Sequence, residues 1–368
     1  MFGALWAAVA LALWLPMLSG HLVLPSAFTP IEWHVHELIY GYVPAVIAGF
    51  LLTAVPNWTG RLPGVGTRLL LLFLTWIAGR IAVLASLWIG AWVAAVVDLA
   101  FLAALGFVVA RELIGGNNTR NLKVLAVVVL LLIGNALFHF EAIDGVGNGY
   151  GTRLGIAAIV LLIMLIGGRI IPSFTRNWLA RRDAGRLPSS FDRFDAAVVA
   201  LSGVALASWV ILPEEMPTAL IALAACGLNC ARLYRWASER TAAELPVLIL
   251  HVAYAFVPIG FLLLALAILT PWLVAPTGAL HGWTAGAIAL MTLAVMTRAS
   301  LGHTGRPLRA TRPIQFIYGC ALITALARIV AAFDVLGEPM LHLSAMAWVF
   351  AFGSFVIIYA PLLTKRRT

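Results

Sequence analysis

The sequence predicts an all-α, polytopic integral membrane protein with about 12 transmembrane helices. Hydrophobic residues make up 62% of its 368 residues and charged residues only 11%, whereas soluble domains carry roughly 25% charged residues. The mean hydropathy is +1.01. The apolar runs are continuous, whereas the strands of a membrane barrel alternate over about ten residues. The chain is therefore expected to lie in a lipid bilayer as a bundle of helices.

Apolar stretches long enough to span a bilayer, which takes about 20 residues, recur along the whole chain. They lie near 1–19, 33–54, 68–87, 89–110, 121–140, 151–174, 194–212, 217–235, 245–269, 278–297, 314–333 and 340–363. The connections are short, so we predict a single transmembrane domain over residues 1–368. The first stretch is interpreted as a span and not as a signal peptide, because no Lys or Arg precedes it and no clear small-residue cleavage site follows it.

The basic residues predict how the spans are oriented. Most of the 24 Lys and Arg residues follow the even-numbered spans or lie in the tail, whereas the opposite connections hold mostly acids. The basic residues concerned are Arg61, Arg68, Arg111, Arg120, Lys123, Arg176, Arg181, Arg182, Arg186, Arg193, Arg232, Arg235, Arg240, Arg298, Arg306, Arg309, Arg312, Lys365, Arg366 and Arg367. The positive-inside rule then places both termini in the cytoplasm. The net charge of +9 is explained by this topology, and no soluble basic face exists to bind nucleic acid.

Histidines gather at the opposite, outer side of the predicted spans. His34 and His36 open the second span, His139 closes the fifth, His281 opens the tenth and His342 opens the twelfth. Imidazole is a common metal ligand, so this distribution indicates a metal or haem site near the outer surface.

Two arginines, Arg80 in the third span and Arg328 in the eleventh, are expected about one to two turns below that surface. A charged residue at such depth is costly and is usually paired or functional. Two intramembrane cations below a histidine-rich rim suit an anionic, metal-bearing ligand such as haem, whose propionates need partners. Arg80 and Arg328 are therefore candidate haem-binding residues.

His34 and His281 are the candidate axial ligands of a haem b. Residues two apart on a regular helix point about 200° apart, so His34 and His36 cannot bind the same metal. His34 heads a stripe of small residues that includes Gly41, and His281 heads a similar stripe that includes Gly286. A flat macrocycle standing parallel to a helix needs such a stripe. The alternative is that the small residues only let two helices approach closely.

A second metal is the candidate role of the remaining outer histidines, His36, His139 and His342. Asn135 lies one turn from His139 on the same helix face, which gives the fifth span a polar patch. Imidazole suits copper, iron and zinc about equally, so spacing alone does not select among them.

Similar motifs end the second, sixth and tenth spans. They read "AVPNWTGR" (54–61), "IIPSFTRN" (170–177) and "TRASLGHTGR" (297–306). The interval of four spans suggests three four-helix pseudo-repeats, near 1–112, 121–235 and 245–363.

The stretches "WHVHELIYGYVPAVIAGFLLTAVPNWTGR", "GGRIIPSFTRN" and "GAIALMTLAVMTRASLGHTGRPL" resemble the signature motifs of the NnrS family, and the resemblance runs through essentially the whole chain. It implies a bacterial inner-membrane protein that contains haem and copper. It also implies a role in denitrification, the nitric oxide response and tolerance of nitrosative stress. The stretch from His34 to Glu37, His281 and the basic inner motifs match that pattern.

The architecture is also similar to that of haem–copper oxidases and related nitric oxide reductases, which have three four-helix arcs and a haem held by histidines of helices two and ten. This chain lacks histidines in its sixth and seventh spans, where those enzymes bind copper. The similarity is an analogy, because a fold does not fix a function.

The leading hypothesis is therefore a haem-containing inner-membrane protein that binds or processes nitric oxide or its nitrosylated iron adducts. His34 and His281 would clamp haem b, and His36 and His139 would bind copper. A bis-histidine haem would transfer electrons from an unidentified donor. The alternatives are a twelve-span transporter and a haem-bearing sensor without turnover, and the sequence alone does not decide whether the protein is an enzyme.

Overall fold

The computed structural model describes residues 1–182, 184–333 and 336–364, and every regular element in these ranges is a helix. Lys365, Arg366 and Arg367, which contribute to the predicted orientation signal, lie outside the described residues. The chain divides into two compact units, Phe2–Ala158 and Ile159–Thr368, here called the N-terminal and C-terminal units. Each unit is described by itself.

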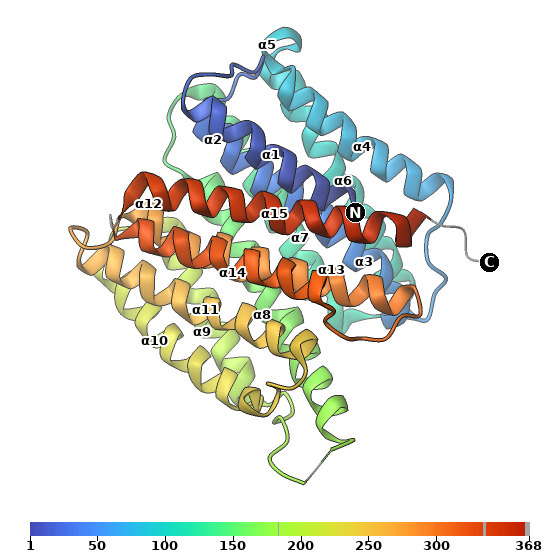
Figure 1. The fold of residues 1–368 in the computed structure, drawn as a ribbon. Coiled ribbons are helices and arrows are strands. Elements are labelled where there is room, and N and C mark those ends of the chain that lie inside the picture. The colour runs from blue at the N-terminus through green and yellow to red at the C-terminus, as the bar shows by residue number, and fades with distance from the viewer. Residues whose placement is uncertain (183, 334–335, 365–368) are drawn as a thin grey trace. The chain divides into compact units, whose positions relative to one another are not determined.

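The N-terminal unit is built around helix α6, which packs against α3, α4 and α7 (Figure 1). Helix α1 packs against α2 and α3. The elements are α1 (Phe2–Leu18), α2 (Pro30–His36), the π-helix η1 (Glu37–Tyr42), α3 (Val43–Thr59), α4 (Thr67–Leu84), α5 (Ser86–Ile89), α6 (Ala91–Gly115), the short 3-10 helix η2 (Thr119–Asn121) and α7 (Leu122–Asp144). Helix α8 (Tyr150–Leu179) begins in this unit and continues into the next.

The C-terminal unit contains two sets of neighbouring helices. In one set α10 packs between α9 and α11, and in the other α14 and α15 lie side by side with α13 against both (Figure 1). The elements are α9 (Arg193–Ile211), α10 (Met216–Tyr234), the 3-10 helix η3 (Ser238–Arg240), α11 (Leu245–Leu269), α12 (Pro276–Ala279), the π-helix η4 (Gly282–Ile288), α13 (Ala289–His303), α14 (Arg312–Ala332) and α15 (Gly337–Thr364).

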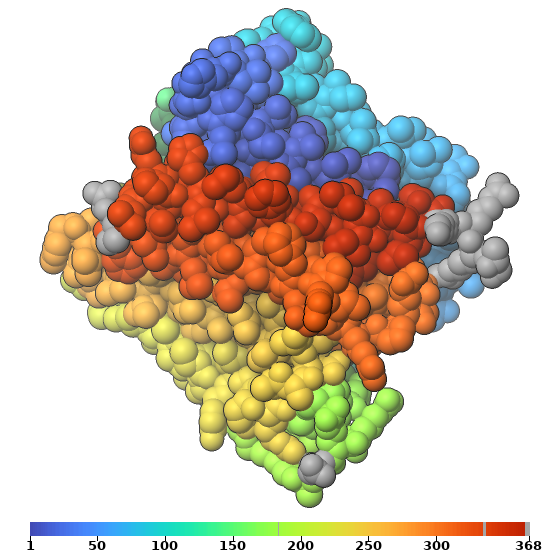
Figure 2. All heavy atoms as spheres, viewed as in Figure 1, coloured from blue at the N-terminus to red at the C-terminus, as the bar shows by residue number. Residues whose placement is uncertain are grey.

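The predicted spans are confirmed as helices. Among the described residues, 11 helices are long and apolar enough to cross a membrane, and α1 is a shorter apolar helix of 17 residues. Figure 2 shows that α14 and α15 form much of the surface of the C-terminal unit in that view. Their exposed side chains include Phe316 and Ile323 of α14 and Phe350 and Ile357 of α15. Apolar side chains on the outer surface are what a lipid-embedded helical bundle requires.

The second and tenth spans depart from the regular helices that the sequence predicts. In the second span the π-helix η1 follows His36 directly, and in the tenth η4 follows His281 directly. A π-helix adds a residue to the turn, is rare, and often marks a functional site. The face assignments made for a regular helix therefore do not continue past His36 or His281.

Candidate metal centre

Six buried polar side chains of the N-terminal unit form one cluster, here called the polar cluster. Each is at most 4% exposed. Its members are His36 at the end of α2, Glu37 at the start of η1, Arg80 of α4, Asp98 of α6, and Asn135 and His139 of α7. Polar groups at this depth need internal partners, because neither lipid nor a packed core supplies any.

Local sequence explains why His36 lies at this place. The Thr29 hydroxyl accepts a hydrogen bond from the backbone N–H of Glu32, and the Glu32 carboxylate accepts one from the backbone N–H of Thr29 at 2.8 Å. This capping box, with Pro30 in the first helical position, fixes the start of α2. His36 then falls in the last residue of α2 and is fully buried.

Three side chains of the polar cluster converge on the Oδ2 atom of Asp98. His36 Nε2 lies 3.2 Å from it and His139 Nε2 lies 3.1 Å from it. The Asn135 amide donates to the same oxygen at 2.7 Å. Among the residues that the structure describes, His36, Asp98 and His139 form the one group whose ligand atoms could hold a metal ion, with all three atoms within 4.8 Å of one another.

Arg80 joins the two carboxylates of the polar cluster. Its Nη2 group donates to Asp98 Oδ1, and its Nη1 group donates to Glu37 Oε2 at 2.5 Å. The Trp6 indole of α1 donates to the same Glu37 oxygen at 2.6 Å. With two carboxylates and one guanidinium, the cluster carries one excess negative charge while both imidazoles are neutral. A buried charge of this kind calls for a positive partner.

The orientation of His36 follows from what faces its two nitrogens. Nδ1 lies 3.1 Å from Glu37 Oε1, and a carboxylate oxygen can only accept, so Nδ1 carries a hydrogen. Nε2 faces Asp98 Oδ2 and, at 3.1 Å, the Asn135 amide oxygen. Because both of these atoms are acceptors, a proton or a metal ion has to lie between them and Nε2.

The donor set of the polar cluster fits a first-row transition metal. Bonds of roughly 2.0–2.2 Å from imidazole and carboxylate ligands to one ion leave the ligand atoms about 3 Å apart, and both histidine-to-Asp98 separations are of that size. Metal-bound histidines usually donate their other N–H to a carboxylate, as His36 does to Glu37. Two imidazoles and one carboxylate suit copper, iron or zinc.

Glycines make room for the polar cluster. A Cβ on Gly41 would lie 2.5 Å from Arg80 Nη1 and 2.6 Å from Glu37 Oε2, and one on Gly79 would lie 2.9 Å from Asp98 Oδ1. The space beside Gly41, which the sequence interpretation assigned to a macrocycle, is thus filled by protein side chains. In the tenth span, a Cβ on Gly286 would meet the Phe256 ring of α11. At both glycines the contacts are those of closely packed protein.

Aromatic rings close the polar cluster on one side. The Phe28 ring centroid lies 5.1 Å from that of His36 and 5.4 Å from that of His139. The Phe138 ring lies 5.4 Å from His36. These rings keep water from the ligand atoms and lower the local dielectric constant, which strengthens every charge interaction inside.

The other residues predicted for the site lie elsewhere. His34 is half-buried and stacks on Trp14, with ring centroids 4.0 Å apart. In the C-terminal unit, His281 lies 3.0 Å through Nδ1 from the Thr277 carbonyl oxygen and 2.9 Å through Nε2 from Arg328 Nη2. His342 is exposed near the start of α15.

The contacts of His281 with Thr277 and Arg328 determine whether it can bind a haem iron. With its hydrogen on Nδ1 and directed at Thr277, His281 offers the lone pair of Nε2, as an axial ligand must. Arg328 donates to that lone pair, so an iron atom there requires the Arg328 side chain to turn away. His34 and His281 belong to different units, and their pairing stays a prediction.

Sequence reasoning missed Asp98 and did not recognise the role of Glu37. Asp98 is an acid in the middle of an apolar span, and such a residue is by itself a signal of function or pairing. A second buried pair lies in the C-terminal unit at the ends of two helices, where Arg232 Nε in the last turn of α10 donates to Asp195 in the first turn of α9 at 2.9 Å.

Comparison with curated proteins finds no match. A family model described as "NnrS protein" matches residues 1–367, essentially the whole chain. This match agrees with the motifs around His36 and His281 and with the all-helical membrane fold. The chain therefore belongs to the NnrS family.

Proposed function

We propose that this chain is a metal-dependent protein of the bacterial inner membrane that binds or processes nitric oxide or its iron adducts, with copper held by His36, Asp98 and His139. Membership of the NnrS family links the chain to the nitric oxide response. The observation that carries the proposal is the convergence of two imidazoles and an amide on one oxygen of Asp98.

Each member of the polar cluster has a distinct proposed task. A bound copper ion would supply one-electron chemistry and a position for a diatomic ligand. Glu37 orients the His36 ring through Nδ1, and Arg80 holds Asp98 Oδ1 so that Oδ2 is directed at the two histidines. Asn135 donates to Oδ2 and fixes its position. Phe28 and Phe138 exclude water.

Haem b is the second proposed cofactor, with His34 and His281 as axial ligands. Arg328 suits a propionate because it already lies beside His281. Arg80 was a candidate for the same role, but both of its amino groups donate to carboxylates, which supports a role in the metal centre instead. An unidentified electron donor would serve the haem, and both termini are proposed to be cytoplasmic.

Metal analysis of the purified full chain tests the copper proposal. After loading with Cu(II) and removal of excess ion, we expect about one copper per chain with an electron paramagnetic resonance signal of nitrogen ligation. His36→Ala, His139→Ala and Asp98→Asn should each lose that signal. His303→Ala, which alters an exposed histidine, is the matched control. Equal copper content in the folded His139→Ala variant and the parent protein would refute the site.

A further inference from the structure

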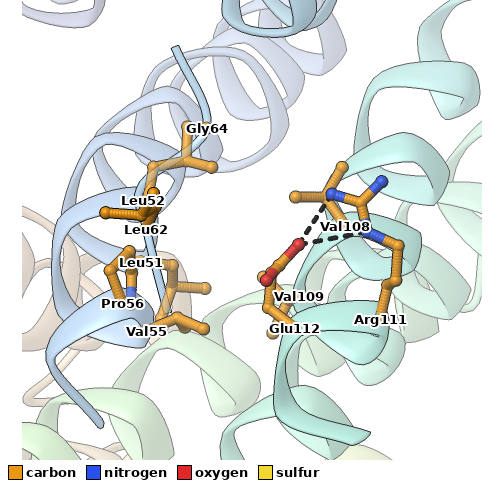
Figure 3. A pocket seen from close by; sticks show the side chains of 10 residues that line it. All are labelled: Leu51, Leu52, Val55, Pro56, Leu62, Gly64, Val108, Val109, Arg111 and Glu112. Atoms are coloured by element: carbon orange, nitrogen blue, oxygen red, sulfur yellow. Dashed lines mark hydrogen bonds and ion pairs between the residues drawn. The ribbon is translucent and has the colours of Figure 1, made fainter. Parts of the chain in front are cut away.

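A shallow hollow opens between the ends of α3 and α6 in the N-terminal unit, away from the polar cluster. Its walls are mostly apolar and come from both helices and from the loop after α3, with Arg111 and Glu112 on the α6 side (Figure 3). The lining residues are Leu51, Leu52, Val55, Pro56, Leu62, Gly64, Val108, Val109, Arg111 and Glu112. The volume of the hollow is only about 30 Å³, so a ligand would lie mostly along the surface.

Charged side chains rim this hollow where the two helices end. Arg61 Nε donates to Glu112 Oε2 at 2.7 Å, and Arg111 Nη2 donates to Glu112 Oε1 at 2.7 Å. Two guanidiniums share one carboxylate, so the rim has a net positive charge. The side chains of Arg61 and Arg111 are 45% and 42% exposed. Arg61 Nη2 and Arg111 Nη1 make no hydrogen bond with any residue that the structure describes, so both can still donate to an anion.

The loop beyond the rim exposes apolar side chains. Gly60 ends α3 in the left-handed conformation, with φ of 69°, and turns the chain so that Leu62 is 90% exposed and Val65 is 70% exposed. Bulky apolar side chains this exposed beside arginines suit the headgroup boundary of a bilayer, where the arginines meet phosphate and the apolar groups meet acyl carbons.

We propose that this hollow binds an anionic phospholipid, with the phosphate held by Arg61 and Arg111 and an acyl chain laid along α3 and α6. The order of the groups matches the order along a lipid: the cations lie near the helix ends, and Leu51, Leu52 and Val108 lie about one to three turns further into the span. Basic pockets between membrane helices are known sites for acidic lipid headgroups.

Lipid titration of the delipidated full chain in neutral detergent, followed by native mass spectrometry, tests this proposal. The first phosphatidylglycerol should bind about tenfold more tightly than phosphatidylcholine. The Arg61→Gln, Arg111→Gln double variant should lose that preference. The matched control, Arg306→Gln with Arg309→Gln, removes two exposed arginines of the C-terminal unit and should keep it.

Because both arginines also hold Glu112, a second variant keeps the charges and fills the hollow. Val108→Trp should weaken phosphatidylglycerol binding several-fold while the rim stays intact. Equal binding of the two lipids, or an unchanged preference in the double variant, would overturn the proposal. Complete displacement of phosphatidylglycerol by millimolar inorganic phosphate would also overturn the proposal, because the site would then hold phosphate without needing an acyl chain.

Discussion

His36 Nδ1 lies 3.1 Å from the carboxylate of Glu37, the next residue in the chain, and both side chains are fully buried. Adjacent residues on a regular helix point about 100° apart. Here the π-helix begins at Glu37, directly after the histidine. The histidine is thereby oriented by its own neighbour, and its other nitrogen is left to face Asp98.

Glu37 is expected to strengthen metal binding by holding the His36 ring in this orientation. Glu37→Gln keeps the size of the side chain but removes its charge, and the loss of an outer carboxylate of this kind typically costs about 10–100-fold in metal affinity. We expect one copper per chain to remain, bound more weakly, when affinity is measured by competition with a chelator. Glu338→Gln, at an exposed position of α15, is the control and should change nothing. Unchanged copper affinity in Glu37→Gln would show that Glu37 does not support the metal site. The assignment of His36, Asp98 and His139 as ligands would not be affected.

Arg80 is expected to be a determinant of stability. Breaking a buried ion pair from one side leaves an uncompensated charge and costs about 3–5 kcal/mol, and Arg80→Gln would leave two carboxylates unpaired. The midpoint of thermal unfolding in detergent should fall clearly below that of Arg68→Gln, which changes an exposed arginine. Adding Asp98→Asn to Arg80→Gln should recover part of the decrease in the unfolding midpoint, because it removes one of the two carboxylate charges that Arg80 no longer neutralises. A double variant less stable than the single one would contradict this account.

Two glycines of the second span give a matched comparison. A Cβ at Gly41 meets Arg80, Glu37 and Trp6, whereas one at Gly49 meets nothing within 4 Å. Overpacking costs about 1–3 kcal/mol, so Gly41→Ala should lower both stability and copper affinity. Gly49→Ala replaces glycine inside a helix and should be neutral or stabilising by up to about 1 kcal/mol. Similar effects of the two substitutions on the unfolding midpoint would show that the space beside Gly41 is not needed.

Much of this architecture could be predicted from sequence. Backbone groups in lipid have to be bonded within the chain, so each long apolar run has to be a helix, and its position can be found from composition alone. His36 and His139 are two of the three outer histidines, with His342, that the sequence leaves for a second metal, and the one-turn spacing of Asn135 and His139 predicts a polar patch on α7. The side chains of His36, Asn135 and His139 meet at Asp98.

The rest depends on which helices are neighbours. That α4, α6 and α7 are adjacent cannot be deduced from their apolar patterns, because the faces of each helix that meet lipid and the faces that meet protein are alike in composition. From the sequence alone, Arg80 is therefore interpreted as a partner of a haem propionate. In the structure its partners are Asp98 of α6 and Glu37 of η1. The π-helices are likewise set by tertiary contacts, and a helical-wheel argument that assumes 3.6 residues per turn cannot anticipate them.

A pH effect is expected outside the membrane, at the start of α9. Hydrogen bonds from Arg235 hold the pKa of Asp192 at about 2, below its ordinary value of 3.8. A carboxyl with a lowered pKa stabilises the fold above its unfolded-state pKa and loses that contribution as pH falls through the folded-state value. The unfolding midpoint should therefore decrease between about pH 4 and pH 2. Asp192→Asn, which keeps a good helix cap, should reduce that decrease, and an identical pH profile in the variant would contradict the assignment.

The pair His281 and Arg328 decides the haem proposal, because an iron atom and the Arg328 guanidinium would compete for the same lone pair on Nε2. If His281 is an axial ligand, His281→Ala should abolish or greatly alter the reduced-minus-oxidised spectrum of the purified protein. If Arg328 binds a propionate, Arg328→Gln should lower the amount of extractable haem and leave a six-coordinate spectrum in what remains. If Arg328 only covers His281 against water, the same variant should bind haem as well as the parent or better. A sharp b-type spectrum that survives His281→Ala in folded protein would exclude this ligand, and the outer histidines would then have to be explained by the copper centre alone.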